Sequence, residues 1–217
     1  MPPEDGESKW AANRPIQIIV EGNDDQTAFT EVAKRMRNAK EAIKEFEVKI
    51  AQGKDKILRR LGAFALEADF IATVSTVVVV VDADQDPDAA RAAMQRALAN
   101  AGLAVPATPS VWAFSTYQGR PIRTRIEILP PTGTGTLEDL VLAGIPPATI
   151  QCVDTFLACA ASFGTPKPIQ LSKAKIQALA ATHIHDGYMH LGAALRDGKL
   201  PLDHPAMDPL RDILRCL

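Results

Sequence analysis

The chain has 217 residues, of which 47% are hydrophobic and 23% are charged, and its formal net charge is −2. These values are those of an ordinary soluble globular protein, and the length indicates one domain, or one domain with an appendage. The polar, acidic first residues and the absence of a long apolar stretch predict neither a secretion signal nor a membrane span. We therefore expect a cytoplasmic protein that does not bind membranes.

The three cysteines are odd in number and show no CxxC spacing: Cys152, Cys159 and Cys216. This pattern predicts reduced, packed thiols rather than a zinc site or a disulfide framework.

The first part of the chain alternates between strand and helix patterns. Residues 1–14 are expected to be a mobile tail, and the apolar run 16–20 predicts a strand that ends at Glu21. From Asn23 the apolar residues fall at helical spacing, and residues 46–50 alternate as a half-exposed strand before a further helix. An ionisable residue at the end of a buried strand is costly without a partner, so Glu21 is a candidate functional residue.

The most informative stretch is the valine run 77–81 and the acids that follow it. Five valines are too apolar for a strand with one wet face and too β-branched for a helix, so they predict the central strand of a parallel sheet. Asp82 and Asp84 come directly after it, at the end of the strand where ligands collect in open α/β sheets. Carboxylate oxygens at this place suit Mg²⁺ or Mn²⁺. The alternative is a polar turn that closes the strand.

Capping explains several other acids of the chain. Asp86 followed by Pro87 predicts a helix start, with Asp86 as the N-cap. Thr136 and Asp139 resemble a capping box, which leaves Glu138 available for another role.

The second half of the chain first shows two strand patterns, at 111–114 and 122–129, and a loop rich in proline and glycine. From Ile145 onward the pattern is helical, with Ser172 as the expected cap of one of the helices. His183 and His185 resemble a metal pair, but no third ligand has a suitable spacing.

One region is basic. Between Lys34 and Arg60 there are ten Lys or Arg residues and four acids, which makes this the candidate phosphate-binding surface. The alternative is a solvated helix face, since no aromatic residues interleave with the charges.

The order of strand, Glu21-Gly22, second strand and Asp82-x-Asp84 resembles the two-part pattern of the Toprim domain, which topoisomerases, bacterial primases and several nucleases share. The resemblance implies an α/β, Rossmann-like fold with a mostly parallel sheet flanked by helices. We expect this Toprim-like domain at residues 15–144 and a helical extension packed on it at residues 145–217. In the Toprim family the glutamate and the two aspartates bind catalytic Mg²⁺.

Four segments together resemble a small stand-alone Toprim-like bacterial family of uncharacterised function. The similarity runs from Pro15 to the C-terminus and rests on residues 20–25, 80–84, 137–140 and 172–176.

The chain is also similar to the Toprim nucleases of the overcoming-lysogenization-defect group, which hold two metal ions. The matching positions are acidic here as well: Glu21, Asp25, Asp82, Asp84 and Glu138. Those nucleases also use a late lysine at the phosphate, which Lys173 or Lys175 matches loosely. This sequence departs from those nucleases in containing no ATPase domain, so their regulation is not carried over to it. It also contains no zinc-binding cysteines or strand-passage domains, which argues against a primase or a topoisomerase.

The resemblance implies a metal-dependent nuclease that hydrolyses phosphodiester bonds of DNA or RNA with Mg²⁺ or Mn²⁺. It implies Glu21, Asp82 and Asp84 around one ion, and Glu21, Asp25 and Glu138 around the second. One alternative is a non-catalytic Toprim-fold subunit that binds nucleic acid or a nucleotide and acts as a homodimer or with a partner protein. The other is a doubly wound sheet whose acids only cap helices, but Glu21 has no such capping role.

Overall fold

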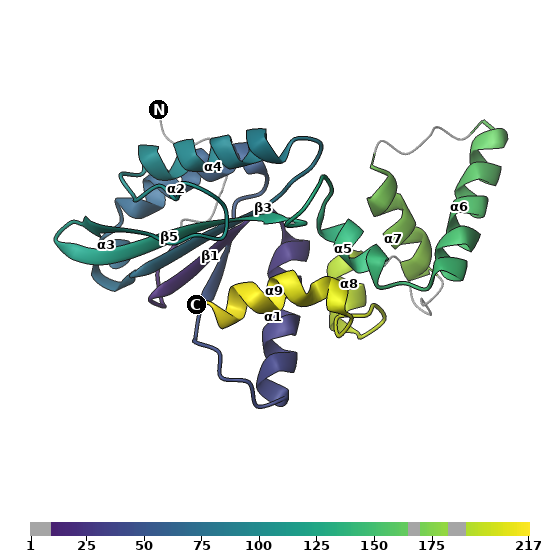
Figure 1. Ribbon diagram of the computed structural model, residues 1–217, viewed down its shortest axis with the longest axis horizontal. Coiled ribbons are helices and arrows are strands. Elements are labelled where there is room, and N and C mark those ends of the chain that lie inside the picture. Colours follow the sequence, from purple (N-terminus) through teal and green to yellow (C-terminus); the bar gives the residue numbers. More distant parts are fainter. Residues whose placement is uncertain (1–9, 165–169, 182–189) are drawn as a thin grey trace. The chain divides into compact units, whose positions relative to one another are not determined.

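A computed structural model describes residues 10–164, 170–181 and 190–217 (Figure 1). The chain divides into two compact units. The first, which we call the sheet unit, comprises Met1–Gly22, Glu45–Val81 and Asp88–Glu127. The second, which we call the helical unit, comprises Asn23–Lys44, Asp82–Pro87 and Ile128–Leu217. The domain boundary expected after residue 144 stays a prediction.

A five-stranded sheet with the order β2-β1-β3-β5-β4 organises the chain. Its strands are β1 (Ile16–Val20), β2 (Glu47–Ile50), β3 (Thr76–Asp82), β4 (Ala113–Tyr117) and β5 (Arg120–Leu129). Strand β1 is parallel to β2 and to β3, whereas β4 is antiparallel to β5. The predicted α/β fold with a mostly parallel sheet is therefore confirmed, and β4 begins two residues later than the sequence pattern indicated.

The valine strand β3 lies in the middle of the sheet, as predicted. Val77 to Val81 are each no more than 3% exposed. Branched side chains fit a pleated strand that is covered on both faces, so this run is buried along its whole length.

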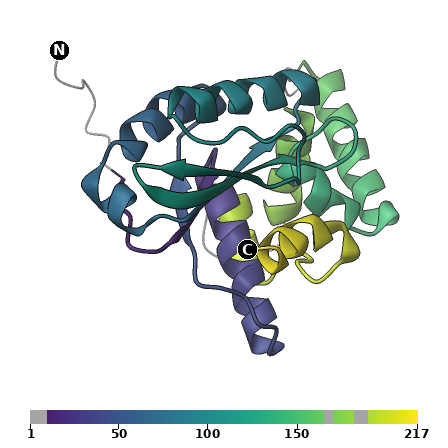
Figure 2. The same cartoon turned by 60° about the vertical axis from the view of Figure 1, so that its left-hand side comes forward.

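The helices of the sheet unit are α2 (Lys54–Ala65), α3 (Ala68–Thr73) and α4 (Pro87–Asn100). Figures 1 and 2 show α2 and α4 on the same face of the sheet. Trp10 stacks edge-on against Phe64, with ring centroids 5.4 Å apart, and Phe64 stacks against Phe70 at 4.9 Å. Part of the expected N-terminal tail thus packs on α2 and α3, while residues 1–9 lie outside the described residues.

The helical unit contains α1 (Asn23–Asn38) and the C-terminal helices that the sequence predicted. These are α5 (Leu137–Ala143), α6 (Pro147–Ser162), α7 (Leu171–Ala181), α8 (Leu191–Arg196), the 3-10 helix η1 (Pro205–Met207) and α9 (Asp208–Arg215). Helix α1 packs against α8 and α9, and α7 packs against both α5 and α6. The amide of Gly192 donates a 2.8 Å hydrogen bond to Asp24, which ties the start of α1 to α8.

In the part of the chain that the structure describes, no helix is both long and apolar enough to span a membrane. The histidine pair that the sequence raised, His183 and His185, lies outside the described residues.

Candidate metal centre

The first part of the candidate site is the aspartate loop, residues 82–87, which begins at the last residue of β3 and belongs to the helical unit. Asp84 has a φ of 49°, a left-handed conformation that aspartate adopts more readily than most residues. Helix α4 begins at Pro87, directly after Asp86, which confirms the predicted helix start. The loop therefore carries Asp82 half-buried and Asp84 exposed.

The second part is the segment 135–139, which leads into α5 and is hydrogen-bonded to the aspartate loop. Asp84 and Gly135 exchange two backbone hydrogen bonds of 2.8 Å each. One carboxylate oxygen of Asp82 accepts a 3.0 Å hydrogen bond from the amide of Leu137. These bonds hold the two aspartates beside the start of α5, although more than fifty residues separate the two segments.

A glycine is required at position 135. Its φ is 133°, and a Cβ there would lie 2.8 Å from a carboxylate oxygen of Asp139. A larger residue would have to adopt this strained φ and would displace the Asp139 carboxylate.

The start of α5 confirms the predicted capping box. The Asp139 carboxylate accepts from the amide of Thr136 at 2.8 Å, and the Thr136 side chain accepts from the amide of Asp139. Glu138 takes no part in this cap and is only 5% exposed. A buried carboxylate is costly without a positive partner, and the Nζ of Lys173 lies 3.7 Å from its Oε1.

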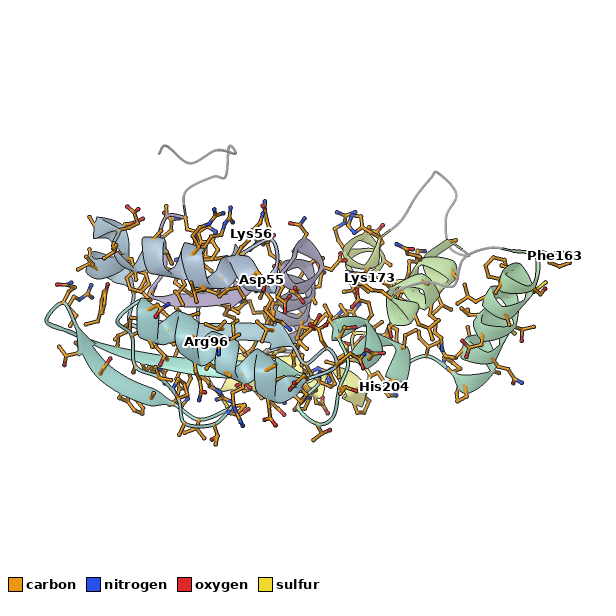
Figure 3. The ribbon with its side chains drawn as sticks, turned by 90° about the horizontal axis from the view of Figure 1, so that it is seen from above. Asp55, Lys56, Arg96, Phe163, Lys173 and His204 are labelled. Carbon is orange, nitrogen blue, oxygen red and sulfur yellow. The ribbon has the colours of Figure 1, made fainter. Side chains whose placement is uncertain are left out.

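The start of α7 is the third part of the site. The Ser172 hydroxyl donates to Asp139. Lys173, which is labelled on α7 in Figure 3, contacts Glu138. Two successive residues of α7 thus contact two successive residues of α5. Ser172 is the second residue of α7, so it acts here as a link between helices instead of as the expected cap.

The two candidate lysines have different surroundings. The Lys173 side chain is about half exposed, at 52%, beside Glu138. Lys175 instead lies 2.7 Å from Asp154 of α6 and is mostly buried. Of these two lysines, only Lys173 therefore forms an ion pair with a carboxylate that was predicted from the sequence to be a metal ligand.

The two remaining candidate residues lie near the ends of other elements. Glu21 belongs to the sheet unit and follows β1 directly, and its Oε1 is 3.7 Å from the Nζ of Lys54. The pairing of Ile19 with Val79, continued by two residues, places Glu21 level with Val81, the residue before Asp82. Asp25 belongs to the helical unit, where it is half-buried in the first turn of α1.

The donor set consists of carboxylate oxygens, which is the chemistry that Mg²⁺ and Mn²⁺ prefer. Among the described residues, no group of three or more His, Cys, Asp or Glu side chains is placed as a metal-binding cluster. The chemical type of these ligands therefore fits a hard divalent ion. The carboxylate side chains would have to turn toward one another to bind the same ion. The backbone links bring Asp82, Asp84 and Glu138 onto adjoining segments, but the structure does not assemble them into a ligand set.

Sequence patterns missed the contacts that Gly135 and Ser172 make in the helical unit, and they did not single out Lys54, which lies beside Glu21 in the sheet unit. Gly135 and Ser172 act through contacts with residues distant in the sequence, which no local pattern reports. Lys54 carries a weak signal, because the Gly53-Lys54 pair follows the parallel strand β2 by three residues and so puts a positive charge near the end of the neighbouring strand, where Glu21 lies.

The family model described as "Protein of unknown function (DUF3226)" matches residues 15–217. No curated protein sequence matches the chain. Among solved structures, the C-terminal region of the Burkholderia pseudomallei OLD protein is similar to this chain, with a TM-score of 0.44 and 14% sequence identity. That match covers 94% of this chain and 100% of the other. Because the family model covers nearly the whole chain, the protein belongs to the DUF3226 family, which confirms the expected family of uncharacterised function.

Proposed function

We propose that this protein is a divalent-metal-dependent nuclease that hydrolyses phosphodiester bonds in DNA or RNA, with Mg²⁺ or Mn²⁺ as its cofactor. The observation that carries the proposal is the hydrogen-bonded link between the aspartate loop and the start of α5. It keeps Asp82, Asp84 and Glu138 on adjoining segments of the helical unit. Neighbouring carboxylates repel one another, and a bound cation relieves that repulsion.

In this proposal Asp82 and Asp84 hold one ion together with Glu21, and Asp25 and Glu138 hold the second, also with Glu21. The assignments of Glu21 and Asp25 rest on the sequence pattern. The register of β1 and β3 supports Glu21, because it puts this residue level with the end of the valine strand. Ions at these positions, when bound, would lower the pKa of a water molecule and neutralise the charge that develops on the phosphate.

Lys173 has the second role in this proposal. Its ammonium group is half exposed and lies beside Glu138, so it is placed to bind a phosphate oxygen and to offset the charge of the reacting group. Lys175 is engaged with Asp154 and has a structural role, which is to hold α7 against α6.

We expect Lys173→Ala to slow cleavage on the order of 100-fold, because it removes a positive charge at the phosphate. Single-turnover cleavage rates measure this effect. The matched control is Lys199→Ala, which removes an exposed lysine from the turn after α8 in the same unit and should leave the rate unchanged. A larger loss in Lys175→Ala than in Lys173→Ala would contradict the choice between the two lysines.

The proposed function itself is tested with the purified chain and labelled single-stranded and double-stranded DNA and RNA. We expect cleavage of at least one substrate with Mg²⁺ or Mn²⁺, and none when EDTA removes the metal. Binding of nucleic acid without cleavage under every condition would instead support the non-catalytic binding subunit. If the chain neither cleaves nor binds any of these nucleic acids, both the nuclease and the non-catalytic binding subunit are refuted.

A further inference from the structure

Helix α6 is nearly uncharged and yet poorly buried. All of it is described, and Val153 is its one buried residue. Residues that are shielded recur at helical spacing and mark the face that packs on α7. They are Ile150, Val153, Leu157 and Ala160. The only charged side chain of α6, Asp154, is engaged with Lys175 of α7.

A second apolar row lies on another side of α6 and is exposed. It consists of Cys152, Phe156, Cys159 and Phe163, which we call the α6 stripe. The prediction that the cysteines are packed is therefore wrong, because these two thiols and that of Cys216 are exposed. Phe156 is 62% exposed, and Phe163, at the end of the helix, is 86% exposed. Figure 3 shows Phe163 projecting beyond the end of α6. Exposed phenylalanines at this density are unusual on one helix of a monomeric protein.

The spacing of the α6 stripe is the spacing of a helix-pairing seam. Successive members are four, three and four residues apart, which is the repeat that packs one helix against another over several turns. The helix therefore has two apolar rows, and within the described residues only the row facing α7 is covered.

The composition of α6 indicates which kind of molecule could bind to the α6 stripe. The helix contains no Lys or Arg, so it offers nothing to a phosphate backbone or to an anionic membrane surface, which amphipathic helices usually bind with basic residues. The stripe itself carries no charge, so an identical stripe is a compatible partner. Symmetric dimers bring the same patch of both subunits together and need only that self-compatibility.

The exposed area is consistent with a dimer. A phenylalanine buries about 150–250 Å² when it is fully covered, so the two partly exposed rings offer on the order of 300 Å² per chain. Two copies would cover about 600 Å² with these rings alone, which is roughly half of a small specific interface. The cysteines of the stripe and the small residues around them add to this area.

We propose that the α6 stripe is a homodimerisation surface, in which α6 of one copy packs against α6 of a second copy. The proposal is independent of the proposed nuclease activity, because it uses none of the candidate metal ligands.

Sedimentation velocity of the full chain over the micromolar range tests the proposal. We expect a dimer for the wild type, and a dissociation constant raised on the order of 100-fold by Phe156→Glu or Phe163→Glu. The matched control is Phe114→Glu on β4, because Phe114 is 73% exposed and lies outside the stripe. A monomeric wild type, or a dimer that survives both stripe variants or is lost in Phe114→Glu, would overturn the proposal.

A second measurement leaves the phenylalanines intact. A short bismaleimide should cross-link the wild type into a covalent dimer through Cys152 or Cys159. Cys216→Ser should cross-link as well as the wild type, although Cys216 is also exposed, whereas the double variant Cys152→Ser, Cys159→Ser should not. Cross-linking that depends on Cys216 alone would overturn the proposal.

Discussion

Asp82→Asn is expected to slow metal-dependent cleavage on the order of 1,000-fold, because it removes the negative charge that the bound ion requires. Asparagine is a better substitution than alanine here. It keeps an oxygen that can accept the hydrogen bond from the amide of Leu137, so the link between the aspartate loop and α5 can survive. Single-turnover rates in Mg²⁺ measure the effect, and thermal unfolding checks that the variant is folded.

The matched control for this variant is Asp88→Asn. Asp88 is an exposed acid in the first turn of α4, where it pairs with Arg91. This control removes one negative charge a few residues further along the chain. Its cleavage rate should stay within about twofold of the wild-type rate, because an exposed ion pair contributes little to stability. Wild-type activity in Asp82→Asn would remove this residue from the proposed centre.

Glu138→Gln is expected to weaken Mn²⁺ binding on the order of 100-fold, as measured by titration calorimetry. The substitution keeps the size of a side chain that is only 5% exposed, but it removes the charge. Lys173 then loses its partner, which costs little because Lys173 is half exposed. The expected loss of Mn²⁺ affinity therefore reflects the loss of a metal ligand and not a change in the packing of the side chain.

A comparison of variants separates this role from a purely structural one. If Glu138 serves only as the partner of Lys173, then Glu138→Gln and Lys173→Ala should both leave Mn²⁺ binding unchanged. If Glu138 is a ligand, Lys173→Ala should preserve or strengthen Mn²⁺ binding, because it removes a competing cation. The control is Asp154→Asn, which breaks the ion pair with Lys175 and should not alter Mn²⁺ binding.

The features that the sequence predicted are local ones. Five valines in a row can hardly form anything but a covered strand, and this strand is the central one. The capping box of Thr136 and Asp139 and the helix start at Pro87 follow from hydrogen-bonding and proline geometry over a few residues. In each case the physical cause lies within the same short stretch of chain.

The features that the sequence could not predict depend on contacts between distant segments. The pairing of Asp84 with Gly135 joins two loops, and nothing in either loop specifies the other. The choice of Lys173 over Lys175 follows from which face of α7 meets α5 and which meets α6. The helical pattern of α6 likewise does not show which of its apolar residues are covered, and only the structure shows that Phe156 is exposed.

The most direct test of the proposed metal centre is the anomalous diffraction of crystals soaked in Mn²⁺. The account predicts manganese peaks among the carboxylate oxygens of Asp82, Asp84 and Glu138, with Glu21 and Asp25 completing the ligands. Crystals that take up manganese elsewhere, or that show these side chains unchanged and without a peak between them, would contradict it.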